Sequence, residues 1–395
     1  MTVKTFSHDF RRGLGSAVIE LQKNPDRAHY RGIVLRCCKK NIAYDWQCEG
    51  TKGHYLYSAI CALGAKEKDE FEGEIIAAFS KRLEYGLFCQ LADILCLYAG
   101  GGSEKSREAL CGKYQNLLDQ VSRQRIFPFK YSEQTQLEYL TEYINGKKEK
   151  EETLPQGPKP EPPEITLEIY AAKAREYADD EYAFVRMRKF SMYLSKQAKQ
   201  DEFAMLASMV ECEQSDEIRA NLLNVFRDVD FPREIAPLFD YAKSGSGRLR
   251  EIAVLALGRF ADGRVHDLAL EFIASGRLDD GLELLLKNWR KEDEPLVRKY
   301  IMASKEVSHS MQQSVNDIYS RHRSKSCGDI LAHIYKNGEC TLCRSKTVRA
   351  MHKNRVLSED ILDECLCDSY EETRKFAKQK MRNKKLKEEK TNENR

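Results

Sequence analysis

The stretch that decides the fold is Arg250-Glu-Ile-Ala-Val-Leu-Ala-Leu-Gly-Arg-Phe-Ala-Asp-Gly-Arg-Val265. Its apolar residues, together with Leu249, recur at intervals of three and four, which is the period of one face of an α-helix. The turn Asp262-Gly263 ends this helix, and a second apolar stripe of the same period continues to Ile273. Two short helices joined by a tight turn cannot enclose a core alone, so we expect both stripes to be buried against neighbouring helices.

The pattern of residues 246–275 recurs upstream in the chain. Moving residues 215–244 forward by 31 positions places Ile218-Arg219 on Leu249-Arg250. Val185-Arg186 lies 33 positions before Ile218-Arg219, and beyond residue 305 the intervals become irregular. Helical patterns fill both halves of the chain, and no segment keeps the alternating pattern of a strand. The sequence therefore predicts an all-α fold.

The opening hydrophobe-Arg pair and the closing Ala256-Leu257-Gly258 before an aspartate turn resemble the inner half of a HEAT repeat. Residues 44–50, 340–344 and 363–369 are similar to segments of uncharacterised bacterial HEAT-repeat proteins. This resemblance implies an α-solenoid of HEAT-like helical repeats, preceded by a helical N-terminal block that is itself HEAT-like or a separate domain.

A proline-rich segment suggests the domain boundary. Residues 146–164 hold five of the ten prolines among charged residues, so this segment cannot be helical and has little to bury. We expect a linker here, between a helical N-terminal domain at 1–145 and the repeat solenoid at 165–383. Residues 384–395 are mostly lysine, glutamate and asparagine, and we expect a charged, frayed tail.

Composition excludes several classes of protein. With 395 residues, 42% hydrophobic and 32% charged, the chain can form folded domains and is not a disordered or collagen-like protein. No run approaches the roughly 18 apolar residues of a membrane span, and Met1–Arg12 lacks the apolar segment of a signal peptide. The thirteen cysteines are odd in number and lie mostly in apolar helical patterns, which indicates reduced thiols and a cytoplasmic protein.

The most unusual local sequence is an acid-aromatic segment at residues 44–57. In a functional interpretation, Asp45 and Glu49 act as acid, base or cation stabiliser, while Tyr44, Trp46 and His54 contact a base or sugar. In the structural alternative, the acids cap helices and the tryptophan fills a corner between them. Nucleotide-binding loops and catalytic triads are absent as motifs, so we expect no cofactor.

The expected architecture also resembles the HEAT-like DNA glycosylases. That resemblance implies a hydrolytic DNA glycosylase in which a carboxylate beside aromatic rings stabilises the positively charged sugar as a damaged or modified base leaves. Trp289 and Asp293 are candidates for these roles, because a four-residue spacing places both on one face of a continuous helix. Alternatively, Trp289 is a core residue of the solenoid.

Basic residues are concentrated in residues 304–355, which hold ten lysines and arginines against four acids. Such a surplus attracts phosphates, so double-stranded DNA is the expected partner. The candidate nucleic-acid contacts, which include two arginines near the starts of earlier inner helices, are Arg219, Arg250, Arg321, Arg323, Arg344, Lys346 and Arg349. In the alternative, the arginines of the repeats bridge to acids of their own or the next repeat and hold the stack together.

The pair Cys340-x-x-Cys343 has two interpretations. With Cys327 and His352 it could supply the four ligands of a zinc site, but buried structural cysteines are the simpler interpretation, and we expect no metal. Two functions remain. The chain is either a DNA-binding HEAT-like solenoid, with DNA N-glycosylase activity as the enzymatic form of this hypothesis, or a non-enzymatic scaffold that binds a protein partner.

Overall fold

The computed structural model describes residues 2–40, 52–81, 83, 85–123, 131–144, 163–180, 183–304 and 306–393. These residues form helices and no β-strand, which confirms the all-α prediction. None of the described helices is both long and apolar enough to cross a lipid bilayer. Contacts divide the chain into two compact units: unit 1 comprises Met1–Leu154 and Ile334–Arg395, and unit 2 comprises Pro155–His333.

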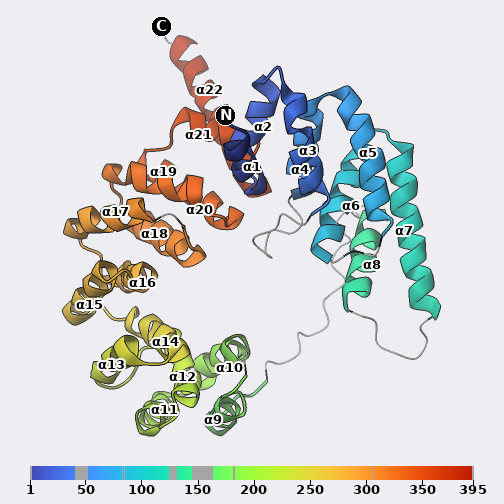
Figure 1. Cartoon of the computed structure of the whole chain (residues 1–395). Coiled ribbons are helices and arrows are strands. Elements are labelled where there is room, and N and C mark those ends of the chain that lie inside the picture. Colours follow the sequence, from blue (N-terminus) through green and yellow to red (C-terminus); the bar gives the residue numbers. More distant parts are fainter. Residues whose placement is uncertain are drawn as a thin grey trace. The chain divides into compact units, whose positions relative to one another are not determined.

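Unit 1 combines helices from the beginning and the end of the chain (Figure 1). They are α1 (Val3–Arg11), α2 (Gly15–Lys23), η1 (Arg27–Tyr30), α3 (Arg31–Cys38), α4 (Lys52–Leu63), α5 (Ala65–Phe79), α6 (Tyr85–Gly100), α7 (Glu104–Arg123), α8 (Tyr131–Ile144), α20 (Thr341–Asn354), α21 (Glu359–Cys365) and α22 (Glu371–Glu393). Helix α19 (Gly328–Asn337) spans the boundary between the units.

Helix α6 lies at the centre of unit 1. It packs against α4, α5, α7 and α8, and it is apolar around most of its circumference, as expected of a fully enclosed helix. Its one buried amide, Gln90, donates hydrogen bonds of 3.0 Å to the carbonyl oxygens of Cys37, Cys38 and Lys40. Gln90 thereby satisfies the carbonyl groups that the end of α3 leaves unpaired.

The two ends of the chain are joined in unit 1 by a buried arginine. Arg344 of α20 is 0% exposed, and its Nε donates to Asp368 at 2.8 Å. Its two terminal nitrogens donate to the carbonyl oxygens of Arg12 and Gly13 at 3.2 and 3.1 Å. Burial lowers the pKa of Arg344, but the charge and hydrogen bond of Asp368 raise that pKa above its ordinary value, so the guanidinium stays charged.

Two glycines at and just before the start of α2 allow a close approach to α21 and to the residues that follow it. Gly13 has a φ of +71°, and a Cβ there would lie 2.4 Å from the Ser369 hydroxyl oxygen. A Cβ on Gly15 would lie 1.9 Å from the Glu364 carbonyl oxygen. The Ser369 N–H donates to the Gly13 carbonyl at 3.2 Å. In Figure 1 the blue N-terminal helices and the red C-terminal helices accordingly lie together.

This grouping differs from the division that the sequence suggested. Residues 334–383, which we expected to continue the repeats, group with the N-terminal helices. The segment expected to fray from residue 384 is helical through Glu393, because it continues α22. Of the expected linker, residues 146–162 lie outside the described residues, and residues 163–164 are not helical.

Unit 2 consists of successive helical pairs. They are α9 (Leu167–Glu176), α10 (Ala183–Gln197), α11 (Gln200–Cys212), α12 (Asp216–Leu223) with η3 (Asn224–Arg227), α13 (Ala236–Ser244), α14 (Gly247–Leu257), α15 (Gly263–Ala274), α16 (Leu278–Asn288), η4 (Lys291–Asp293), α17 (Glu294–Ala303), α18 (His309–Arg321) and η5 (Lys325–Cys327). Helices α12, α14, α16 and α18 pack against one another in series, while α11, α13 and α15 pair with the helices that follow them (Figure 1).

The stretch Arg250–Val265 lies on α14, the turn and the start of α15, as its period predicts. Its stripe from Leu249 to Leu257 is buried, and Asp262 caps α15 by accepting a hydrogen bond of 2.8 Å from the Arg264 N–H.

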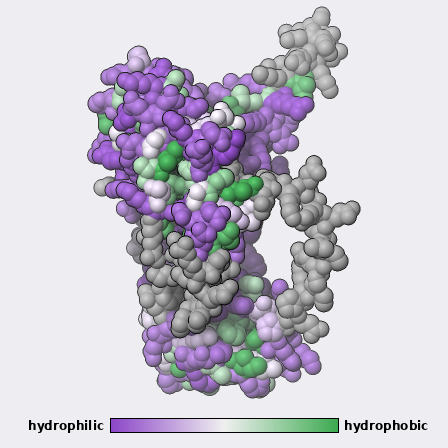
Figure 2. Space-filling view, turned by 90° about the vertical axis from the view of Figure 1, so that its right-hand side faces the viewer, coloured by the Kyte–Doolittle hydropathy of each residue, from purple (hydrophilic) through white to green (hydrophobic). Residues whose placement is uncertain are grey.

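Polar contacts in unit 2 repeat at the period of the helical pairs. Ion pairs join Lys243 to Glu271, Arg259 to Asp230, Arg264 to Glu234 and Arg298 to Asp329, over 28 to 31 positions. Exposed pairs of this kind contribute little to stability, but they favour contact between consecutive helical pairs over contact between other pairs. Elsewhere the surface is mostly hydrophilic, and Figure 2 shows one face on which hydrophobic side chains form only small interruptions.

Candidate functional site

Of the acid-aromatic segment at residues 44–57, the structure describes only residues 52–57. Tyr44, Asp45, Trp46 and Glu49 lie outside the described residues. His54 is exposed on α4, where partial desolvation and the nearby charges of α22 lower its pKa. This imidazole is therefore neutral at pH 7 and lies beside a basic helix.

The predicted pairing of Trp289 with Asp293 is wrong. Helix α16 ends at Asn288, and α17 begins at Glu294 with a proline in its first turn, so no continuous helix joins the two residues. Trp289 lies edge-on to Tyr319, with ring centroids 5.7 Å apart. It therefore packs within unit 2, as the structural alternative proposed.

Asp293 is buried and forms hydrogen bonds within the protein. Its side chain is 5% exposed, and its two oxygens lie 3.0 and 3.1 Å from Nε2 of the buried His266. It also accepts a hydrogen bond of 2.8 Å from the Arg290 N–H, which orders the turn before α17. A carboxylate with these partners and this burial cannot approach a sugar in a bound nucleic acid, so its catalytic assignment is withdrawn.

The predicted phosphate contacts of unit 2 differ in their surroundings. Arg219 donates to Asp216 at 2.7 Å and to the Val210 and Glu213 carbonyls, and its guanidinium lies 5.0 Å from the ring centroid of Tyr241. These contacts support the bridging alternative for this arginine. Arg250 is half-buried on α14, whereas Arg321 and Arg323 are exposed at the end of α18.

In unit 1, the predicted phosphate contact at Arg344 is wrong, because this side chain is fully buried against Asp368. Lys346 and Arg349 are exposed on α20, and Lys353 follows one turn later on the same face. The sequence therefore identified two exposed members of a basic helix face together with a buried neighbour.

Helix α22 carries a run of basic residues. Residues 374–387 contain eight lysines and arginines and no acid. Lys378 and Arg382 are exposed, and Lys380 is half-buried. Helix α22 packs on α20 through Phe376, whose ring centroid lies 5.1 Å from the Arg349 guanidinium carbon and 5.2 Å from the Lys380 Nζ.

These residues define what we call the α20–α22 surface: Lys346, Arg349, Lys353, Lys378, Lys380 and Arg382. Its acidic neighbours lie at the start of α22, where Glu372 is 3.8 Å from Arg349 and also pairs with Lys375. The run 374–387 was visible in the sequence. We expected residues 374–383 to belong to the helical repeats and residues 384–387 to a frayed tail, whereas one helix contains the whole run.

Two other groups in unit 1 bear on chemistry. The Cys340 thiol caps α20 by accepting a hydrogen bond of 3.2 Å from the Cys343 N–H, and both cysteines are buried. Asp93 of α6 is largely buried, and burial raises its pKa to about 7, although a hydrogen bond from the Tyr139 hydroxyl lowers it in part. A Cβ on Gly53 would lie 2.1 Å from the Asp93 Cβ, so α4 packs directly over this carboxyl group.

Comparisons with protein-family models, curated proteins and solved structures found no match to this chain.

Proposed function

We propose that this chain is a HEAT-like helical-repeat protein that binds nucleic acid through the α20–α22 surface. The observation that carries the proposal is the basic run 374–387 on one helix, packed beside the exposed cations of α20. A dense run of cations attracts a polyanion and releases its counterions on binding. The paired helices of unit 2, with contacts that recur about every 30 residues, support the HEAT-like assignment.

Unit 2 is less suited to a polyanion than unit 1. Residues 155–333 contain 26 lysines and arginines against 30 acids, a net charge of −4, whereas residues 334–395 contain 16 against 11, a net charge of +5. Several arginines of unit 2, such as Arg219 and Arg264, are already paired with carboxylates. We therefore place phosphate contacts in unit 1.

Base excision receives no support from the described residues. Asp293 is buried against His266, and the other candidate acids, Asp45 and Glu49, lie outside the described residues. The proposed activity is binding.

A second candidate function applies to unit 2. Its helix α10 exposes Val185 at 66% and Met192 at 41%, which lie two turns apart on one face. Exposed apolar side chains on a net acidic unit favour a protein partner with an apolar and basic surface, as in the scaffold hypothesis.

Fluorescence anisotropy with labelled oligonucleotides tests the nucleic-acid proposal. The test variant combines Lys346→Gln, Lys353→Gln and Lys378→Gln on the α20–α22 surface. The matched control combines Lys196→Gln, Lys291→Gln and Lys299→Gln, which are exposed lysines of unit 2. At about 50 mM salt we expect the test variant to bind at least about tenfold more weakly than the wild type, with the control unchanged. Equal losses in both variants, or in neither, would contradict the assignment of this surface.

A further inference from the structure

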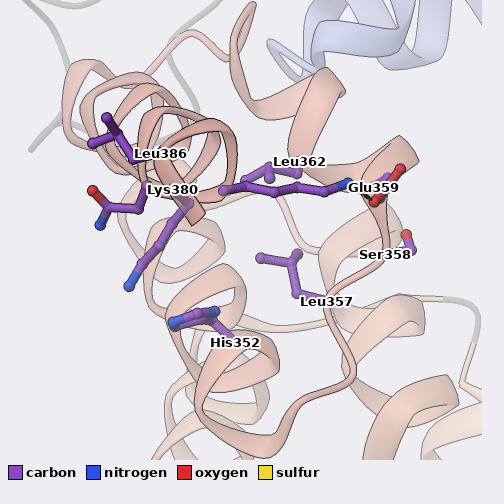
Figure 3. Close-up of a pocket in the computed structure, with 9 residues that line it drawn as sticks. His352, Leu357, Ser358, Glu359, Leu362, Lys380 and Leu386 are labelled. Carbon is purple, nitrogen blue, oxygen red and sulfur yellow. Dashed lines mark hydrogen bonds and ion pairs between the residues drawn. The ribbon is translucent and has the colours of Figure 1, made fainter. Parts of the chain in front are cut away.

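A groove adjoins the α20–α22 surface within unit 1. It lies between the end of α20, the following loop, α21 and α22, and it encloses about 550 Å³. Leu357, Leu362 and Leu386 form its apolar lining. Figure 3 shows Leu357 and Leu362 facing the space between the helices, with His352 and Lys380 on one side and Ser358 and Glu359 on the other.

The groove has one cation available to a ligand. Lys384 pairs with Glu359, so these two charges neutralise each other. Lys380 has no carboxylate partner among the described residues, and its Nζ lies beside the Phe376 ring. A bound molecule with a single negative charge would therefore complement Lys380.

Polar groups that can still form hydrogen bonds also line the groove. The Asn383 amide makes no hydrogen bond to another described residue, and the Ser358 oxygen accepts one from the Ile361 N–H at 3.3 Å while its own O–H remains a donor. Partial desolvation and the charge of Lys380 lower the pKa of His352, so its neutral ring offers both a donor and an acceptor at pH 7. The groove thus combines an apolar floor, hydrogen-bonding groups of both kinds and one cation.

We propose that this groove takes one unpaired nucleotide of a single-stranded nucleic acid that lies along the α20–α22 surface, an inference that rests on the proposed function. The phosphate lies at Lys380, the planar base packs on the leucines, and the edge of the base meets Asn383 and Ser358. In a duplex the bases are stacked and paired, so none can enter without being extruded. The site therefore prefers single strands to duplexes.

An acidic peptide with apolar side chains would also complement the leucines and Lys380. It would use the hydrogen-bonding groups less fully, because a leucine side chain offers no polar edge to Asn383 or Ser358. The run of cations in residues 374–387 further matches a ligand with a charge on every residue, such as a polynucleotide. We therefore favour the nucleotide and test the peptide as the competing occupant.

The experiment compares three ligands: a single strand of about twelve nucleotides, the same single strand with abasic sites, which keeps every phosphate, and the same strand in a duplex, which has about twice the phosphates. We expect the intact single strand to bind at least about tenfold more tightly than the other two. The variant Leu386→Gln with Asn383→Ala should reduce single-strand affinity to the duplex level and leave duplex binding unchanged. Leu386 is 45% exposed, so this change does not disturb the core, and Met302→Gln, at 44% exposure in unit 2, is the matched control.

The outcomes separate this inference from the proposed function. Binding of all three ligands with equal affinity, unaffected by the groove variant, would overturn the groove and leave the α20–α22 surface intact. Displacement of a bound single strand by a peptide of alternating glutamate and leucine, with no effect of abasic sites, would assign the groove to a peptide. Failure of every oligonucleotide to bind would overturn both proposals.

Discussion

Replacing Arg344 with methionine removes the positive charge that joins the N-terminal and C-terminal segments of unit 1. The substitution leaves Asp368 buried without its ionic partner. The Arg12 carbonyl oxygen loses the Arg344 donor, and the Gly13 carbonyl oxygen keeps the Ser369 N–H as a donor. Removing one partner of a buried ion pair costs about 3–5 kcal/mol, because the remaining charge is uncompensated. For a unit of this size, about 2–4 °C of Tm accompanies each kcal/mol, so the transition of unit 1 should fall by about 6–20 °C.

Thermal denaturation combined with amide hydrogen exchange measures this effect. Protection should fall in α1 and α2 as well as in α20 and α21, although these helices are more than 300 residues apart, while α14 and α16 of unit 2 keep their protection. Arg36→Met, an exposed position on α3, is the control and should change Tm little. The double variant Arg344→Met with Asp368→Leu leaves no buried charge and should recover part of the loss.

The reasoning is refuted if Arg344→Met behaves like Arg36→Met, with a change below about 1 kcal/mol and unchanged exchange in α1 and α2. That result would mean that contacts other than the Arg344 ion pair hold the N-terminal helices in unit 1.

Three further changes test other parts of the account. Burial raises the pKa of Asp93 to about 7, so the folded state retains a proton that the unfolded state loses. The free energy of unfolding should therefore fall by up to about 4 kcal/mol between pH 4 and 8. Urea denaturation of Asp93→Asn should show a flatter dependence of this free energy on pH. Asp293→Ala should destabilise unit 2 by about 1–3 kcal/mol in the same assay, because it leaves the buried His266 without its partner, while nucleic-acid affinity stays unchanged. Gly281→Ala should also destabilise unit 2 by about 1–3 kcal/mol, because a Cβ there would lie 2.7 Å from a carbonyl oxygen of α15. By contrast, Gly73 lies in open space within α5, so Gly73→Ala should stabilise unit 1 by about 0.5–1 kcal/mol. A pH profile of Asp93→Asn that matches the wild type, or an unchanged denaturation midpoint in Asp293→Ala, Gly281→Ala or Gly73→Ala, counts against the corresponding prediction.

Local periodicity predicted the helices well. The stripe from Leu249 to Leu257 is buried as its spacing predicts, because a period of 3.6 places these residues on one face whatever the neighbours are. The 31-residue offset between repeats reappears in the spacing of the ion pair between Arg298 and Asp329, and the pair between Arg264 and Glu234 spans 30 positions.

Burial of charged residues could not be predicted in the same way. Arg344 and Lys346 lie two positions apart in one basic segment, yet Arg344 is buried because Asp368 and the carbonyls of residues 12 and 13 meet it there. Those partners are 24 and more than 330 positions away, so only the folded chain reveals them. Asp293 was misassigned for a related reason, since its partner His266 lies 27 positions upstream.

The basic surface was predicted in part. Lys346 and Arg349 were identified from the local surplus of charge, and the structure confirms that both are exposed on one face of α20. Their neighbours on α22, Lys378, Lys380 and Arg382, lie in the segment that we expected to continue the repeats, and they were not among the predicted contacts. Phe376, whose ring contacts Arg349 and His352, packs this basic helix against α20.

The salt dependence of single-stranded DNA binding tests the central claim most directly. Each neutralised phosphate contributes about 0.7 to the slope of log affinity against log salt concentration. Removing Lys346, Lys353 and Lys378 together should therefore reduce the slope by about 2, while removing Lys196, Lys291 and Lys299 of unit 2 should leave it unchanged. The same slope in the wild type and in both variants would contradict the claim that the α20–α22 surface binds the phosphates.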